Sequence, residues 1–204
     1  VDIRVIEEFR KQSIPVVLVN NYLDMDGLVC ISADHYGGAV QATEYLCKLG
    51  HCKIGLLSGR FSPQVSEARI EGFVKTLAKY DIPVDDRFIA DIEPALEDGE
   101  EIMTRMLREV DRPTAFFCTN DTIAAGGMKA VTRAGLRVPE DIAIIGFDDS
   151  YISRVVEPEL TTVRIDAAKM GCLAMQTLFD LIAGMPVEKA HIQIPTELIV
   201  RGTA

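Results

Sequence analysis

Short apolar runs alternate with longer segments of helical period along most of the chain. The apolar runs are VVLVN (16–20), KIGLLSG (53–59), AFFCTN (115–120) and IAIIGF (142–147), and the helical segments include ATEYLCKLG (42–50), ARIEGFVKTLAKY (68–80) and IAAGGMKAVTRAG (123–135). The apolar runs are continuous and do not alternate with polar residues, which is typical of strands in a parallel sheet covered by helices on both faces. The pattern predicts a doubly wound α/β protein.

Polar residues and glycines mark the ends of the predicted helices. Asp34 can cap the helix that ends at Gly50, and either Asn120 or Asp121 can cap the helix that ends at Gly135. Residues of these types satisfy the unpaired backbone groups at the two ends of a helix. The registers of these two helices are therefore predicted from local signals alone.

The last part of the chain indicates a second lobe. The strand at 142–147 is followed by a predicted loop at PELTTVRID (158–166), a helical pattern at KMGCLAMQTLFDLIAG (169–184) and a strand-like segment at AHIQIPTELIV (190–200). A chain with this order could cross to another sheet and return. The early segment, residues 1–33, has no complete sheet of its own, so we expect it to join residues from the late part of the chain.

Composition and charge limit the classes of function that the chain can have. The 204 residues are 48% hydrophobic and 25% charged, which is typical of a globular protein. A net charge of −10 argues against nucleic-acid binding by these residues, because affinity for phosphates comes from clustered lysine and arginine. No apolar run is long enough to span a bilayer, and the chain opens on a charged stretch where a signal peptide would be apolar.

Cysteine usage and the acidic residues predict no metal site. The five cysteines are scattered, odd in number and without a CxxC pair, so we expect neither a zinc site nor a disulfide framework, and a cytoplasmic location follows. The acidic run EPALEDGEE (93–101) is interpreted as a solvated start of a helix. We therefore expect no cofactor.

Three polar side chains fall where a parallel sheet binds ligands, beyond the carboxyl ends of its strands. Arg69 follows the run 53–59 and, in a helix expected to begin after Ser66, opposes the helix dipole in its first turn; Asn120 and Asp148 follow two further runs. A guanidinium, an amide and a carboxylate facing one cleft suit a polyol, whose hydroxyls both donate and accept. Plainer alternatives stay open: Asp148 and Asp149 as turn or cap residues, Asn120 as a helix cap, and Arg69 on a solvated face.

Catalytic signals are poor. The chain has no GxSxG, GxGxxG or P-loop motif, and its three histidines lie in no recognisable metal or triad spacing. Asp148 and Asp149 could hold Mg²⁺, but no lysine or nucleophile motif accompanies them. We do not expect an enzyme.

Longer stretches of the chain resemble a known family. GHCKIGLLSGRFSPQVSEARIEGF (50–73), PTAFFCTNDTIAAGGMKAVTRAGLRVPEDIAIIGFDDS (113–150) and PELTTVRIDAAKMGCLAMQTLFDLIAG (158–184) resemble the effector-binding core of the lactose and purine repressor family of bacterial transcription regulators. IPVVLVNN (14–21), followed by Asp34 and ATEYLCKLGH, is similar to that family as well. The stretches cover nearly the whole chain, in order.

The resemblance implies a periplasmic-binding-protein-like fold with a small effector held between two α/β lobes. Matched residue by residue, Arg69, Asn120 and Asp148 correspond to positions that contact the effector, and Asp149 is expected to be structural. The resemblance gives weaker candidates as well, near positions that shape the pocket: Val65, Ile92 and Ala167.

The resemblance also implies partners and a division into domains. The family begins with a DNA-binding headpiece that is missing before Val1, so we expect an incomplete N-terminal lobe formed by residues 1–33 and 164–189, and a C-terminal lobe formed by 34–163 and 190–204. We expect a cytoplasmic homodimeric repressor that responds to a sugar or a related molecule and contacts DNA only through that headpiece. The alternative is a transport-linked periplasmic sugar-binding protein of the same fold.

Overall fold

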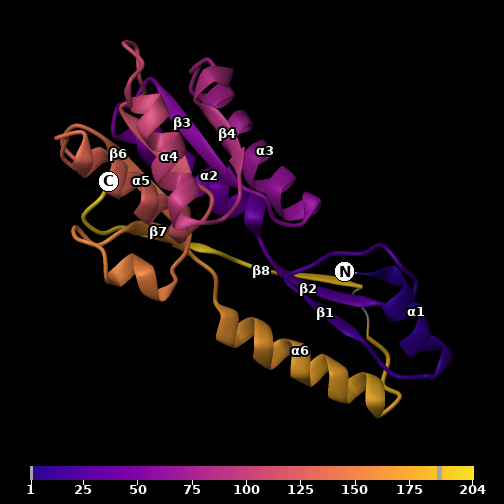
Figure 1. The fold of residues 1–204 in the computed structure, drawn as a ribbon. Helices are drawn as coiled ribbons and strands as arrows, with labels where there is room; N and C mark the ends of the chain where they lie inside the picture. The colour runs from indigo at the N-terminus through magenta and orange to yellow at the C-terminus, as the bar shows by residue number, and fades with distance from the viewer. Residues whose placement is uncertain (1, 188–189) are drawn as a thin grey trace. The chain divides into compact units, whose positions relative to one another are not determined.

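The computed structural model describes residues 2–187 and 190–204 (Figure 1) and divides the chain into two compact units. The large unit consists of His35–Ile165 and Thr196–Ala204. The small unit consists of Val1–Asp34 and Asp166–Pro195. Each unit is therefore assembled from two separate stretches of the chain.

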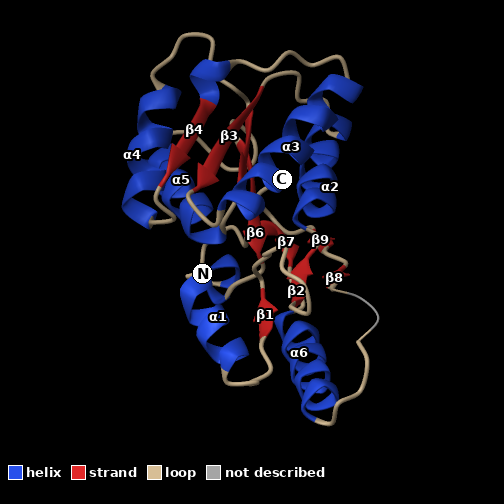
Figure 2. Ribbon diagram, turned by 90° about the vertical axis from the view of Figure 1, so that its right-hand side faces the viewer, coloured by secondary structure: helices blue, strands red, loops and turns tan. Residues whose placement is uncertain are grey.

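The described residues of the large unit form a six-stranded sheet (Figure 2) with the strand order β4-β3-β5-β6-β7-β9. The strands are β3 (Ile54–Gly59), β4 (Ile89–Ile92), β5 (Ala115–Cys118), β6 (Ala143–Asp148), β7 (Thr161–Arg164) and β9 (Glu197–Ile199). Neighbouring strands are parallel, except that β9 runs antiparallel to β7. All residues of β3 and β5 are buried, which explains why their sequences are continuously apolar.

Two pairs of helices cover the two faces of this sheet (Figure 2), and short 3-10 turns connect some of the elements. The elements are α2 (His35–Lys48), which packs on α3 (Pro63–Lys79), α4 (Leu96–Leu107), which packs on α5 (Asp121–Arg133), and the turns η1 (Asp86–Phe88) and η2 (Tyr151–Arg154). A separate apolar core lies under each pair. Phe117 belongs to the core under α2 and α3, and its neighbour Phe116 to the core under α4 and α5, as the alternation of side chains along a strand requires.

Glycine allows the helices of each pair to approach closely. A Cβ atom on Gly72 of α3 would lie 2.7 Å from the carbonyl oxygen of Tyr36 in α2. A Cβ atom on Gly126 of α5 would lie 2.1 Å from the carbonyl oxygen of Leu96 in α4. Both positions therefore exclude any larger side chain unless a helix moves.

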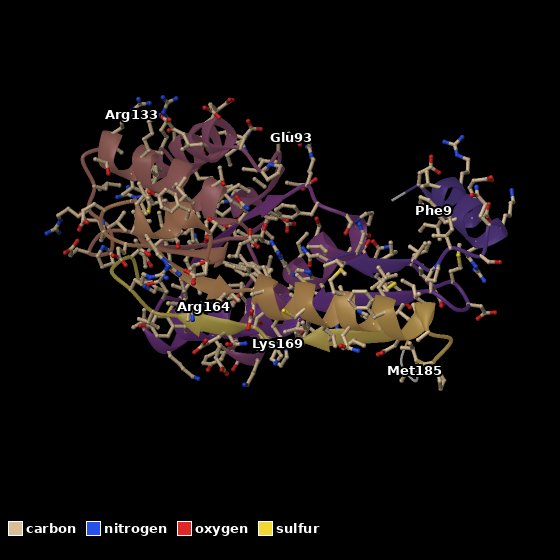
Figure 3. The ribbon with its side chains drawn as sticks, turned by 90° about the horizontal axis from the view of Figure 1, so that it is seen from below. Phe9, Glu93, Arg133, Arg164, Lys169 and Met185 are labelled. Carbon is tan, nitrogen blue, oxygen red and sulfur yellow. The ribbon has the colours of Figure 1, made fainter. Side chains whose placement is uncertain are left out.

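The described part of the small unit contains a three-stranded parallel sheet with the order β1-β2-β8. Its elements are α1 (Ile3–Lys11), β1 (Val17–Val19), β2 (Val29–Ala33), α6 (Ala167–Ile182) and β8 (His191–Ile194). α6 packs against β1 and β2, and a small apolar cluster forms around Ile6 and Leu18. Phe9 on α1 and Met185 beyond α6 have exposed apolar side chains (Figure 3).

The main expectations of fold are confirmed. The chain has the predicted α/β fold, with parallel sheets and helices on both faces of the larger one. Asn120 caps α5, and Gly50 and Gly135 follow α2 and α5 with φ of 91° and 74°, the backbone conformation typical of helix ends.

Three details of the prediction were wrong. The helix expected after Ser66 begins at Pro63, because proline is well suited to the first position of a helix. The segment 158–166 was expected to be a loop but contains β7. Its threonines are polar, which suggested a loop, yet they are buried beside β6. The strand-like segment 190–200 is two strands in different sheets, which Pro195 separates.

The boundaries of the two units differ from the predicted division. The predicted second lobe included 190–204, whereas residues up to Pro195 belong to the small unit, because β8 pairs with β2. The other boundaries differ by one or two residues: they fall after Asp34 and after Ile165, where 33 and 163 were expected. Val1, Glu188 and Lys189, which the predicted division covers, lie outside the described residues.

Candidate functional site

Polar groups converge at the carboxyl ends of three neighbouring strands of the large unit. β3, β5 and β6 are adjacent and parallel, so their carboxyl ends meet at one edge of the sheet. Asn120 lies just beyond β5, and Asp148 is the last residue of β6. Arg69 reaches the same place from α3, the helix that follows β3. Open α/β sheets bind their ligands at such an edge.

Arg69 is a buried cation with several partners. Its side chain is 2% exposed, and its guanidinium donates to the carbonyl oxygen of Thr119, to Nδ1 of His35 (Nη2 to Nδ1, 3.2 Å) and to Oδ1 of Asp148 (3.3 Å). The guanidinium carbon also lies 3.9 Å from the centre of the Phe147 ring, a cation–π distance. The guanidinium is therefore fixed in position before any ligand arrives.

The location of Arg69 corrects one step of the sequence argument. Because α3 begins at Pro63, Arg69 lies in the second turn of the helix and not in the first. The effect of the helix dipole is largely confined to the first turn, so opposition to it does not single out this residue. Burial is the feature that distinguishes Arg69, and it excludes the alternative that Arg69 lies on a solvated face of the helix.

His35 is a member of this cluster that the sequence did not reveal. It is the first residue of α2 and is 5% exposed. Burial, and secondarily the positive charge of Arg69, lower the pKa of His35 to about 3. The imidazole is therefore neutral near pH 7, and its Nδ1 can accept a hydrogen bond from the guanidinium.

Asn120 has two roles at once. Its Oδ1 accepts hydrogen bonds from the backbone N–H groups of Thr122 (2.8 Å) and Ile123 (3.2 Å), which makes it the N-cap of α5. Its Nδ2 donates to Oδ2 of Asp148 at 2.9 Å. The cap alternative and the site prediction are thus compatible, because the two ends of the amide serve different partners.

Asp148 connects the other two predicted site residues. One carboxylate oxygen accepts from Arg69 and the other from Asn120, while 30% of the side chain stays exposed. Burial raises the pKa of Asp148, and the charge of Arg69 and the hydrogen bond from Asn120 oppose that rise. Each oxygen has a second lone pair, so the carboxylate can still accept from the hydroxyl or N–H groups of a ligand.

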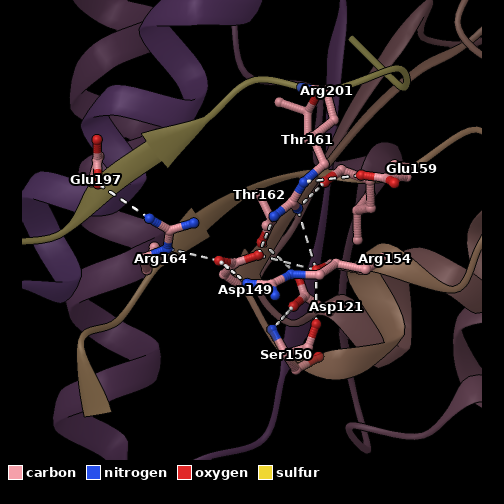
Figure 4. A network of polar contacts seen from close by, with 12 residues as sticks. Asp121, Asp149, Ser150, Arg154, Glu159, Thr161, Thr162, Arg164, Glu197 and Arg201 are labelled. Carbon is pink, nitrogen blue, oxygen red and sulfur yellow. Dashed lines mark hydrogen bonds and ion pairs between the residues drawn. The ribbon is translucent and has the colours of Figure 1, made fainter. Parts of the chain in front are cut away.

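Asp149 faces different partners from its neighbour (Figure 4). Its side chain is 2% exposed and accepts from Arg201 (Nη2 to Oδ1, 2.5 Å), from Arg164 (Nε to Oδ2, 2.7 Å) and from Arg154 (Nη2 to Oδ2, 3.3 Å). Burial alone would raise its pKa, but the hydrogen bonds from Arg201 and Arg164 hold the pKa of Asp149 at about 2. This agrees with the structural role expected for the residue.

Asp121 is a second buried carboxylate beside the site. Sequence reasoning treated it only as a possible helix cap, whereas the structure buries it completely and makes it an acceptor for the Ser150 backbone N–H (2.6 Å) and the Thr162 hydroxyl (2.5 Å). Burial raises the pKa of Asp121 to about 6. Its partners lie far away in the sequence, so no local signal could have indicated this role.

The weaker candidates Val65, Ile92 and Ala167 lie on three different elements. Val65, on α3, is 7% exposed, and Ile92, the last residue of β4, is 6% exposed. Ala167 is the exposed first residue of α6 and belongs to the small unit. Their roles in the pocket stay predictions.

Two kinds of feature are absent from residues 2–187 and 190–204. Within those ranges, no three His, Cys, Asp or Glu side chains are grouped in a way that could hold a metal ion. None of the helices in those ranges combines the length and the apolar character that crossing a bilayer requires.

Comparisons with known proteins place this geometry in context. Residues 43–204 match the family model described as a periplasmic binding protein-like domain. The HTH-type transcriptional repressor PurR of Pasteurella multocida is 35% identical over 191 residues, which cover 93% of this chain and 57% of the repressor. The chain thus spans little more than half the length of that relative.

Solved structures agree with the fold. A regulatory protein of the LacI family from Chloroflexus aggregans superposes with a TM-score of 0.90 at 30% identity, over 97% of this chain and 71% of that one. A LacI family transcriptional regulator from Enterococcus faecium, with bound ribose, gives a TM-score of 0.89 at 26% identity, over 100% of this chain and 75% of that one. These relatives are transcriptional regulators, which confirms the expected resemblance and does not favour the transport-linked alternative.

Proposed function

Because the chain belongs to the LacI family of regulatory proteins and carries a periplasmic binding protein-like domain, we propose that it is the effector-sensing part of a bacterial transcriptional repressor. The observation that carries the proposal is the junction of Arg69, Asn120 and Asp148 at the carboxyl ends of adjacent parallel strands. Nothing in this arrangement provides a nucleophile beside a base, so we propose binding without turnover.

The proposed effector is a sugar or a closely related polar molecule. Vicinal hydroxyls can donate to the partly exposed carboxylate of Asp148, while the Asn120 amide and the Arg69 guanidinium supply donors beside it. The related regulator from Enterococcus faecium, which contains ribose, supports this class of ligand. The buried Val65 and Ile92 are proposed to face apolar parts of the effector.

The proposed mechanism is a shift between conformations of a dimer. An effector that binds one conformation more tightly than the other changes their populations, and the whole regulator would carry that change to DNA. The net charge of −10 favours DNA contact through a separate basic segment over contact through these residues. Such a repressor would act in the cytoplasm as a homodimer.

A ligand panel tests the proposal. The full-length protein would be screened by thermal shift against monosaccharides, disaccharides, sugar acids, nucleosides and nucleobases, and each hit measured by calorimetry. We expect at least one ligand to raise the melting temperature, because binding to the folded state alone stabilises it by mass action. The same ligand should change the affinity of the protein for its operator DNA.

Three outcomes would contradict the proposal. One is that no member of the panel binds. Another is that a ligand binds with equal affinity to the wild type and to the Asp148→Ala variant, which would place the binding site elsewhere. The third is turnover of a bound ligand, which would favour an enzyme instead.

A further inference from the structure

The turn that carries Asp148 and Asp149 has an unusual backbone. Asp148 has a φ of 111° and Asp149 a φ of 52°, so two successive residues other than glycine have positive φ. The value for Asp148 lies outside the small left-handed region that such residues can adopt easily. A backbone of this kind persists only where surrounding contacts hold it in place.

Contacts hold the turn before and after these two residues. On one side, Asp148 ends β6 and pairs in register with Arg164 of β7. On the other side, the backbone N–H of Ser150 donates to Oδ2 of Asp121 at 2.6 Å. The side chains of Asp148 and Asp149 add further contacts between these two anchor points.

The Asp149 side chain is the buried anchor of the turn. At 2% exposure it accepts from three arginines and from the Ser153 hydroxyl, at 3.1 Å (Figure 4). Charge-assisted hydrogen bonds of this kind are about twice as strong as neutral ones. A shift of the turn would therefore break several strong contacts together.

The three arginines do not contribute equally. Arg154 and Arg164 are 59% and 40% exposed, so water and salt screen their charges. Arg201 is 11% exposed, and its Nη1 also donates to the Leu160 carbonyl oxygen (2.7 Å) and to the Ser153 hydroxyl (3.2 Å). Arg201 therefore connects the segment after β9 to the turn through contacts that are largely buried.

We propose that Asp149 and Arg201 are positioning residues of the effector site, and that their ion pair fixes the turn which presents Asp148 to Arg69 and Asn120. The inference rests on the proposed function, because it assigns Asp148 to the effector. The physical link is short: Asp149 is bonded directly to Asp148, and the contact of Asp148 with Arg69, at 3.3 Å, is already near the limit of a hydrogen bond. A displacement of a few tenths of an ångström would remove that contact.

The test uses two variants of the full-length protein and a matched control. Asp149→Asn removes the charge but keeps the size of the side chain and its tolerance of positive φ, and Arg201→Gln removes the opposite charge. Arg154→Gln is the control, because it removes a cation from the same carboxylate at an exposed position. Each protein would be labelled with ¹⁵N-asparagine, and the Asn120 side-chain amide recorded by NMR without ligand.

The Asp148→Ala variant calibrates the readout, since it removes the acceptor of the Asn120 amide. We expect Asp149→Asn and Arg201→Gln to move the Asn120 amide signals by at least half of the shift seen in Asp148→Ala, and Arg154→Gln to leave them in place. Unchanged Asn120 signals in the first two variants, even with lower melting temperatures, would overturn the proposal and leave a purely structural role. If one of these two variants fails to fold, the other decides by the same criterion.

The readout needs no effector, so the two proposals can fail separately. If no ligand of the panel binds the wild-type protein, the proposed function fails while the Asn120 signals still decide whether Asp149 and Arg201 position Asp148. If a ligand binds and the Asn120 signals do not move, the positioning role fails alone.

Discussion

Replacing Asp148 by asparagine removes one negative charge from the proposed effector site and preserves the size of the side chain. Aspartate and asparagine are both enriched at positive φ, so exchanging one for the other adds little backbone strain at the φ of 111°. Asp148→Ala would remove the same charge but add backbone strain. The asparagine variant therefore isolates the contribution of the carboxylate.

The structure sets the expected magnitudes. A hydrogen bond to a charged group contributes about 1.5–3 kcal/mol, so loss of the carboxylate should weaken effector binding by about 2 kcal/mol, or roughly 30-fold at 25 °C. The buried Arg69 also loses its anionic partner at 3.3 Å. Because 30% of the Asp148 side chain is exposed and Arg69 keeps its contact with Thr119, we expect a loss of stability of only about 1 kcal/mol, below the value for a fully buried pair.

Calorimetric titration of the full-length protein, with the ligand that the panel identifies, measures the loss of effector affinity. Urea unfolding measures the loss of stability. The control is Asp91→Asn, which removes a 59% exposed carboxylate from β4 at the edge of the same sheet and should change affinity less than about twofold. Wild-type affinity in Asp148→Asn, or an equal loss in both variants, would refute the reasoning.

Three further variants test other parts of the site. Arg69→Lys should reduce effector affinity at least about tenfold in calorimetry, because a point charge cannot replace a planar guanidinium with several partners; unchanged affinity would remove Arg69 from the site. Asn120→Ser keeps a capping oxygen but loses the amide N–H groups, so affinity should fall while stability against urea changes by less than about 0.5 kcal/mol, and an equal loss of both would mean that the residue is only a cap. Asp121 has a pKa of about 6 in the folded state against an ordinary 3.8, so its burial destabilises the fold at neutral pH and this effect disappears as pH falls through that window. Asp121→Asn should therefore reduce the change in unfolding free energy between pH 3.8 and about pH 6. An unchanged pH dependence would contradict the raised pKa of Asp121.

Local signals predicted the elements that local chemistry determines. The cap at Asn120 and the ends of α2 and α5 depend on residues within one turn of the helix, and they were found. The start of α3 depends equally on local chemistry, since Ser62 and Pro63 form a recognisable helix start. The apolar spacing that predicted this helix begins only after Pro63, so the spacing does not indicate where the helix starts.

The remaining errors arose where distant residues decide the structure. The threonines of β7 are polar, and only their pairing with β6 makes the segment a strand. His35 lies 34 residues from Arg69 in the sequence, and Asp121 lies 41 residues from Thr162. The proximity of Arg69, Asn120 and Asp148 was predictable because all three lie at the carboxyl ends of neighbouring parallel strands, whereas the buried residues around them required the fold.

The order in which the large unit is synthesised follows from its division into two stretches. Residues 196–204, which supply β9 and Arg201, leave the ribosome only after the whole small unit has been made. Until then the nascent sheet ends at β7, and Asp149 lacks the least exposed of its three arginines. Translation therefore adds Arg201 to the surroundings of this carboxylate after its other partners, and a ribosome stalled within the small unit would hold a large unit in which Asp149 has only Arg154, Arg164 and Ser153 as partners.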